Sequence, residues 1–189
     1  MTSFKNIFVI YGPSGSGQDS VIEGVAKQIA IERVITTVTR PMRSTESQGH
    51  PYYFISREEF EKEIKQSSLL EYVEKYLGVY YGVTTKEVER IAKSGAVGIW
   101  KVDFEGARNL KQRFPELTVI FINAHLDIIE ERLRKRGDIT EEDLQARLSH
   151  IREWLPKKTY DYKVENEEGK LDQTIEQVAR IIKEHTEKK

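Results

Sequence analysis

Residues 6–20 read Asn-Ile-Phe-Val-Ile-Tyr-Gly-Pro-Ser-Gly-Ser-Gly-Gln-Asp-Ser, and this stretch decides the fold. Its first six residues are mostly β-branched or aromatic, which is typical of a short buried strand. Three glycines follow within six residues, and a helical pattern then covers residues 19–29. A strand, a glycine-rich turn and a helix in this order bring backbone N–H groups to a helix N-terminus, where they bind phosphate. The stretch therefore predicts a phosphate-binding loop.

Strand-like and helical patterns alternate along most of the chain. Apolar runs rich in β-branched or aromatic residues recur at 97–102, 118–122 and 162–164. Helical patterns follow them and cover residues 104–114, 126–136, 141–155 and 171–184. This alternation predicts an α/β fold in which a parallel sheet is flanked by helices.

A change in residue composition and pattern between residues 34 and 84 indicates an inserted lobe. Thr, Tyr and Gly are dense there, and short strand-like pieces surround one helix that begins with the capping box Ser56-Arg57-Glu58-Glu59. A second capping box, Thr84-Thr85-Lys86-Glu87, predicts a helix that ends near Gly95. We therefore expect a core of residues 1–33, 85–132 and 148–189, a lobe of residues 34–84 and a helical lid of residues 133–147.

Composition excludes several classes of function. The 189 residues include 30 Lys and Arg against 31 Asp and Glu, so no overall basic field exists to hold a nucleic acid. The absence of cysteine excludes disulfides and thiolate catalysis. No apolar run reaches the roughly 20 residues of a membrane helix, and the first residues lack a signal-peptide pattern. We expect a cytoplasmic protein, a monomer or small homo-oligomer, that binds neither nucleic acid nor membranes.

The loop departs from the common phosphate-loop pattern at two positions. In G-x-x-x-x-G-K-[ST] the lysine reaches the β- and γ-phosphates and the hydroxyl holds Mg²⁺. Here Gln18 and Asp19 stand at those positions. The residues alone allow a phosphate cradle or a plain glycine-rich turn, and we favour the cradle because the loop follows a strand and begins a helix.

Several motifs in the right order make the chain similar to the guanylate kinases over nearly its whole length. The loop matches their GPSGxGK[ST] as far as Gly17, and residues 36–54 resemble their TTRxPRxGE segment with the YxF that follows. Residues 70–72, 80–82, 102–106, 132–147 and 164–167 resemble their FxEW, YYG, DIDxQG, arginine-bearing lid and VxND segments. The resemblance implies a P-loop kinase fold with a GMP-binding lobe and a helical lid, and transfer of a phosphoryl group from ATP to GMP with Mg²⁺.

The resemblance also implies roles for individual residues. The group expected to bind the ATP phosphates comprises Gly12, Ser14, Gly15, Ser16, Gly17, Gln18, Asp19 and Ser20. The group expected to bind GMP comprises Thr36, Arg40, Arg43, Glu46, Tyr52, Glu71, Tyr81 and Asp103. Asn166 is expected to contact a nucleotide base or ribose, and Arg136 and Arg147 are expected to stabilise the transferring phosphate.

The chemistry of the GMP-binding residues agrees with these roles. Arg40 and Arg43 lie three residues apart, so both guanidinium groups can converge on one phosphate, for which their planar geometry is suited. Glu71 can accept hydrogen bonds from the N1–H and N2–H₂ groups of guanine, a donor pair that adenine lacks.

Lys101 stands where the family has the first aspartate of its DIDxQG segment. Relative to the family, Gln18 removes one positive charge, Asp19 adds one negative charge and Lys101 adds two units of positive charge, so the net charge is unchanged. The resemblance implies that the strand that carries Lys101 lies beside residues 6–11, because this acidic strand end of the family lies near its phosphate loop, so we expect the ammonium to reach Asp19 or the phosphates. Lys101 is then a catalytic candidate, and Asp19 is a candidate ligand of the Mg²⁺ that accompanies ATP.

Two other functions remain open at this point. One is a catalytically inactive module of the same family that binds GMP or a phosphorylated partner. The other is a kinase for a different phosphorylated acceptor, because Val83 stands where the family has a second hydroxyl for the base. The presence of Arg136 and Arg147 favours an enzyme, because an inactive module is expected to lose the lid arginines as well.

Overall fold

The larger sheet has five parallel strands in the order β2-β7-β1-β8-β9. The computed structural model describes residues 4, 6–75, 78–137 and 140–187. The strands of this sheet are β1 (Ile7–Tyr11), β2 (Ile31–Arg33), β7 (Val97–Lys101), β8 (Thr118–Asn123) and β9 (Tyr162–Glu165). The expectation of a parallel sheet is confirmed. The short edge strand β2 is an addition that the sequence patterns did not predict.

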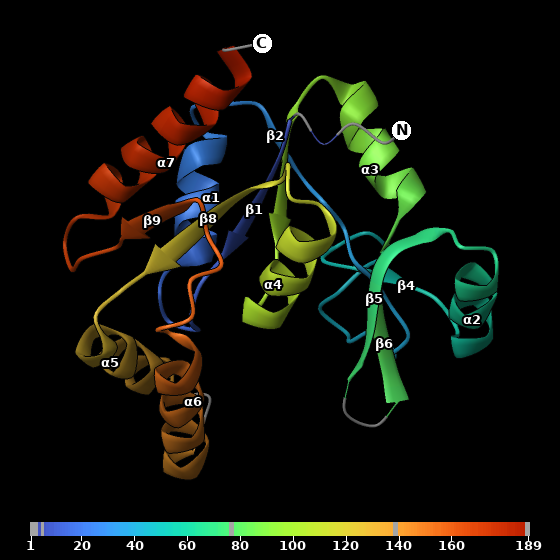
Figure 1. Ribbon diagram of the computed structural model, residues 1–189. Coiled ribbons are helices and arrows are strands. Elements are labelled where there is room, and N and C mark those ends of the chain that lie inside the picture. Colours follow the sequence, from blue (N-terminus) through green and yellow to red (C-terminus); the bar gives the residue numbers. More distant parts are fainter. Residues whose placement is uncertain (1–3, 5, 76–77, 138–139, 188–189) are drawn as a thin grey trace.

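Helices cover both faces of this sheet because the central strand is apolar on both sides. Ile7, Val9 and Tyr11 belong to one buried cluster, whereas Phe8 and Ile10 belong to another. The second cluster is covered by α1 (Gln18–Ala26) and α7 (Leu171–Glu187). The first is covered by α3 (Thr85–Ser94) and α4 (Phe104–Arg113), and it continues into α5 (Leu126–Arg136) and α6 (Glu141–Trp154), which lie beyond the C-terminal ends of the strands in Figure 1. Among the described residues, no helix is both long enough and apolar enough to span a membrane.

A second sheet occupies the region that was expected to form a lobe. Its strands β3 (Thr37–Val38), β4 (Tyr53–Phe54), β5 (Leu69–Lys75) and β6 (Val79–Thr84) follow the order β4-β3-β6-β5. Helix α2 (Arg57–Lys65) connects β4 to β5, and the whole region lies beside the larger sheet in Figure 1. The chain therefore carries two separate sheets, while the division into core, lobe and lid as functional units stays a prediction.

Of the two predicted capping boxes, the one at Ser56 forms completely and the one at Thr84 forms only in part. At Ser56 both halves form, because the side chain accepts from the Glu59 N–H and the Glu59 carboxylate accepts from the Ser56 N–H. At Thr84 the side chain accepts from the Glu87 N–H, but the Glu87 carboxylate is used elsewhere. That buried carboxylate accepts hydrogen bonds at 2.9 Å from the Ile35 N–H and from Arg90. Glu87 thus ties α3 to the segment that enters the second sheet.

Candidate functional site

The loop between β1 and α1 has the backbone conformation of an anion-binding turn. Gly15 and Gly17 have φ values of +88° and +87°, and the Ser16 N–H donates to the Pro13 carbonyl at 3.0 Å. Left-handed residues that alternate with right-handed ones form a concavity lined by N–H groups. The Ser16 hydroxyl is fully buried and has no hydrogen-bond partner within the described parts of the chain. Its expected role toward a phosphate stays a prediction.

Asn166 supports the loop from the end of β9. Its Nδ2 donates to the Ser16 carbonyl at 2.7 Å, and its Oδ1 accepts from the Thr174 hydroxyl at 3.2 Å. Only 2% of Asn166 is exposed. The contacts observed for this amide are with the protein, and its expected contact with a base or ribose stays a prediction. Arg132 of α5 adds a second support, because its Nη1 donates to the Gly15 carbonyl at 3.3 Å.

Gln18 folds into the loop and carries no charge there. Its Nε2 donates to the Gly12 carbonyl at 2.7 Å and to the Pro13 carbonyl at 3.4 Å. Its Oε1 is buried and finds no partner among the residues that the structure describes. A neutral amide whose N–H groups serve carbonyls of the loop offers no cation to a nucleotide phosphate. Any positive charge at this end of the loop comes from other elements.

Lys101 brings that charge to the start of α1. Strand β7 pairs with β1 so that Lys101 lies opposite Ile10, and the Lys101 Nζ lies 2.5 Å from Oδ2 of Asp19. The expectation that these strands are neighbours and that Lys101 reaches Asp19 is confirmed. Arg33, at the end of β2, lies 3.2 Å from the other oxygen of Asp19 and was missed by the sequence patterns. Asp19 therefore lies between two cations.

The two cations keep Asp19 ionised. Partial burial alone raises the pKa of Asp19, but the hydrogen bond and charge of Lys101, followed by those of Arg33, lower it further than burial raises it. The net result is a pKa below the ordinary 3.8. At neutral pH the three side chains together carry one net positive charge at the N-terminus of α1.

A second cluster of candidate residues lies on the segment between β3 and β4 and on the neighbouring strand β6. Arg40 donates two parallel hydrogen bonds to Glu46, at 2.6 and 2.7 Å, and its guanidinium lies 5.4 Å from the centre of the Tyr52 ring. Hydrogen bonds with Glu46 and then with Tyr81 raise the pKa of Arg40. The structure thus brings together four of the residues expected to bind GMP. Arg43 is exposed nearby and donates its backbone N–H to Glu46 at 2.9 Å.

The residues expected to read the base lie on neighbouring segments of the second sheet. Glu71 is half-buried on β5, directly after a register shift, and lies opposite Val83 of β6. Val83 is fully buried, so its apolar side chain is part of the core. Thr36 is half-buried immediately before β3. Their roles toward a base stay predictions.

The remaining candidates are placed at helix ends or on the surface. Asp103 caps α4, because its Oδ1 accepts from the Gly106 N–H at 2.8 Å. Arg147 is exposed on α6, whereas Arg136 ends α5 and its side chain lies outside the described part of the structure. Ser14 and Ser20 are exposed at the loop and in the first turn of α1.

The residues at the loop fit a magnesium ion that is carried by a nucleotide. Across the described ranges, 6–75, 78–137 and 140–187, no three His, Asp or Glu side chains gather as a metal site. Mg²⁺ that accompanies a nucleotide needs only one or two carboxylates, because phosphates and waters complete its shell. Asp19 is one such carboxylate, and it is ionised and half-exposed.

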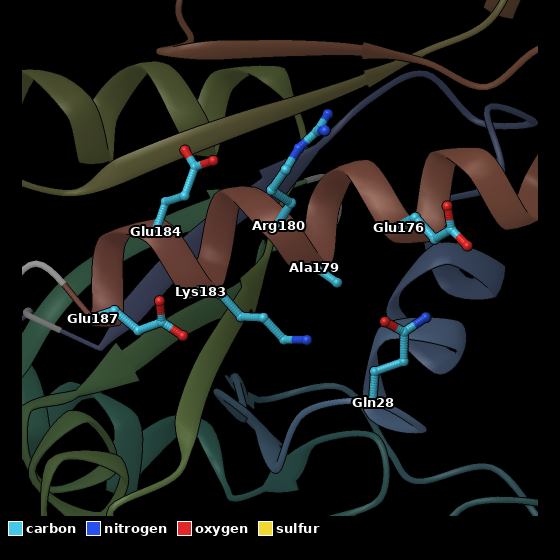
Figure 2. A pocket seen from close by; sticks show the side chains of 7 residues that line it. All are labelled: Gln28, Glu176, Ala179, Arg180, Lys183, Glu184 and Glu187. Atoms are coloured by element: carbon cyan, nitrogen blue, oxygen red, sulfur yellow. The ribbon is translucent and has the colours of Figure 1, made fainter.

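A surface cavity of about 380 Å³ lies between α7 and the segment that follows α1. Figure 2 shows Lys183 extending from α7 toward the side on which Gln28 lies, whereas Arg180 extends away from Gln28. Gln28 comes after the C-terminal end of α1, whereas the loop between β1 and α1 lies at the N-terminal end of that helix. The cavity is therefore separate from the candidate site.

These features define the class of protein. A parallel sheet with a glycine loop between its central strand and α1, together with a second sheet that gathers arginines and tyrosines, is the arrangement of a P-loop kinase. The guanylate kinase family profile matches residues 4–185. A guanylate kinase of Fusobacterium nucleatum is 35% identical over 182 residues, which cover 95% of this chain and 97% of the relative. One of Rickettsia bellii is 33% identical over the full length of both chains.

The chain belongs to the guanylate kinase family, and its relatives support its place among the nucleoside monophosphate kinases. The crystal structure of guanylate kinase from Anaplasma phagocytophilum has the same fold, with a TM-score of 0.68 and 23% identity. The match covers 96% of this chain and 86% of that one. The expected family and fold are confirmed.

The Arg40–Glu46 pair makes a testable contribution to stability. The hydrogen bonds from Arg40, and then that from the Arg43 N–H, lower the pKa of Glu46 from 4.5 to about 2. Because the folded pKa is the lower one, the carboxylate stabilises the folded protein above about pH 4.5 and loses this effect as the pH falls toward 2. We expect Glu46→Gln to lower the free energy of unfolding by a constant amount from neutral pH to about pH 5 and by progressively less below that.

Urea denaturation at a series of pH values measures this difference. Glu23→Gln, an exposed change on α1, is the control and should be close to wild type at neutral pH. A Glu46→Gln chain as stable as wild type at neutral pH would show that the pair contributes nothing.

Proposed function

We propose that this protein transfers the γ-phosphoryl group of ATP to GMP, giving ADP and GDP, with Mg²⁺ bound to the nucleotide. The observation that carries the proposal is the Lys101 ammonium 2.5 Å from Asp19, beside a loop whose own Gln18 is neutral. Phosphoryl transfer needs positive charge near the β- and γ-phosphates, because negative charge is spread over the transferring group. Lys101 supplies from β7 the charge that the loop lacks. The names of the relatives support ATP and GMP as the substrates.

On the donor side, the loop binds the phosphates of ATP and Lys101 neutralises part of their negative charge. The backbone N–H groups of the loop and the start of α1 hold the ATP phosphates, and the buried Ser16 hydroxyl gives one more hydrogen bond. Asp19 would hold the Mg²⁺, which would supply positive charge to offset the negative charge of the nucleotide phosphates. Lys101 exchanges its contact with Asp19 for contact with phosphate oxygens. Gln18 keeps the loop closed through its bond to the Gly12 carbonyl.

On the acceptor side, the second sheet holds GMP. Arg40 and Arg43 bind its phosphate together with the hydroxyl groups of Tyr52 and Tyr81. Glu46 fixes the orientation of the Arg40 guanidinium through two parallel hydrogen bonds.

The other proposed contacts to GMP come from the second sheet and from the end of a strand in the larger sheet. Glu71 accepts from the two donors of guanine, and Thr36 donates to the guanine O6. Asp103 lies at the C-terminal end of β7, the edge of a parallel sheet where ligands bind, and contacts the acceptor nucleotide.

The lid completes the site. In this proposal the residues 133–147 close over both nucleotides and bring Arg136 and Arg147 to the transferring group, while residues 34–84 form the GMP-binding lobe. Closure excludes water, which would otherwise accept the phosphoryl group. The protein makes no covalent bond to the substrate, and its work is to align the attacking GMP oxygen and neutralise charge.

The first prediction concerns Lys101. We expect Lys101→Ala to lower kcat by about 100-fold or more, because it removes the cation assigned to the transferring group. The combined change Lys101→Asp, Gln18→Lys and Asp19→Ser should restore turnover, since it returns the family arrangement of charges. Each of these changes alone should leave an unbalanced charge and do worse than the combination. A coupled assay of ADP formation with GMP, beside AMP, UMP and dGMP, measures the effect.

Lys93→Ala is the matched control, because Lys93 is 80% exposed on α3 and should not affect turnover. Full activity of Lys101→Ala would remove Lys101 from the mechanism. If the unaltered chain binds GMP but forms no ADP, it is the inactive binding module instead. Turnover with another nucleoside monophosphate in place of GMP would identify a different acceptor.

The second prediction concerns selectivity for guanine. We expect Glu71→Gln to weaken GMP binding by about 2 kcal/mol, or roughly 30-fold, because one donor of guanine loses its acceptor in the closed pocket. AMP binding should hardly change. Calorimetric titration of the two nucleotides measures the difference, with Glu74→Gln on the same strand as the control. Equal losses for GMP and AMP would show that Glu71 supports the sheet and does not read the base.

A further inference from the structure

Arg33 is a second cation at Asp19, and neither the loop pattern nor the family motifs assign it a role. Its Nη1 lies 3.2 Å from Oδ1 of Asp19, while Lys101 holds Oδ2. We propose that Arg33 is a positioning residue that keeps Asp19 paired when Lys101 moves to the phosphates of ATP. This inference rests on the proposed function, because it takes Lys101 as the cation that contacts phosphate.

The strand order decides which of the two cations is free to move toward ATP. Strand β7, which carries Lys101, is the direct neighbour of β1, and the loop continues from β1. Strand β2, which carries Arg33, lies one strand further out at the edge of the sheet. Arg33 pairs in register with Ile99, two residues before Lys101. Lys101 is therefore the cation nearer to the loop, and Arg33 approaches Asp19 from the far side.

The role of Arg33 follows from the negative charge of Asp19. If Lys101 were the only partner, the ionised Asp19 would compete with the phosphates for its ammonium. With Arg33 in place, Asp19 keeps one charge-assisted hydrogen bond after Lys101 leaves. The planar guanidinium suits this task because it can hold a carboxylate in a fixed orientation. Arg33 thus lowers the free energy needed to transfer Lys101 from Asp19 to ATP.

The expected size of the effect on ATP affinity follows from the solvent exposure of the three side chains. The side chains of Arg33, Asp19 and Lys101 are 45%, 55% and 35% exposed, so water and salt screen their charges. Interactions of such partly exposed pairs are small, and we expect a change in ATP affinity of about two- to fivefold. A direct contact between Arg33 and phosphate is the competing explanation. The two explanations differ in whether the effect of Arg33 on ATP binding requires Asp19.

A double-mutant cycle separates them. Calorimetry measures ATP binding in the presence of EDTA for the wild type, Arg33→Gln, Asp19→Asn and the double variant. We expect Arg33→Gln to weaken ATP binding by about two- to fivefold in the wild type and to have no effect when Asp19 is already Asn. Arg33→Lys should recover much of the loss, and GMP binding should stay unchanged. Arg180→Gln, an exposed change on α7 at the cavity of Figure 2, is the matched control.

Three outcomes would overturn the inference. Wild-type ATP affinity in Arg33→Gln would mean that the Arg33–Asp19 pair does not act on ATP. An equal loss in the Asp19→Asn background would mean that Arg33 contacts phosphate by itself. Absence of ATP binding by the unaltered chain would remove both this inference and the proposed function. By contrast, a chain that binds ATP with the expected cycle but makes no GDP would contradict the proposed function alone.

Discussion

In the proposed mechanism, the cation that binds the ATP phosphates comes from the neighbouring strand, because the loop itself carries the neutral amide of Gln18. The parallel pairing of β7 with β1 meets this constraint. It sets the end of β7 beside the first turn of α1, where Lys101 reaches Asp19 at 2.5 Å. A shift of this register by one residue would turn Lys101 to the other face of the sheet. The buried apolar faces of β1, which set the register, therefore also set the electrostatics of the site.

The remaining parts of the site are held by contacts that do not depend on a loop lysine. Asn166, at the end of β9, and Arg132, on α5, donate to carbonyl groups of the loop, so the loop is supported from two other elements. In the second sheet, Glu46 and the ring of Tyr52 hold the Arg40 guanidinium. These contacts hold the side chains of both clusters in place, which lowers the entropy lost when substrates bind.

The sequence allowed the parallel sheet and most helices to be predicted, because each leaves a local signal, whereas the Lys101–Asp19 pair was predicted from the comparison with the family motifs. Alternating patterns mark the strands and helices, and the change of charge at Lys101 marks the pair. Arg33 was missed because β2 has only three residues and no run of β-branched residues, so nothing marked it as part of the sheet. The contacts of the buried Asn166 amide and of the buried Glu87 carboxylate could not be predicted from sequence patterns either. Their partners lie 150 and 52 residues away in the chain, a separation that no local pattern records.

The central claim is that Lys101 replaces the missing loop lysine as the cation on the ATP phosphates. A crystal structure of the chain with a non-hydrolysable ATP analogue tests it most directly. The account predicts the Lys101 Nζ within about 3 Å of a β- or γ-phosphate oxygen, as in a charge-assisted hydrogen bond, with Asp19 still paired to Arg33. A bound analogue with Lys101 still on Asp19 and no cation of β7 near its phosphates would contradict it.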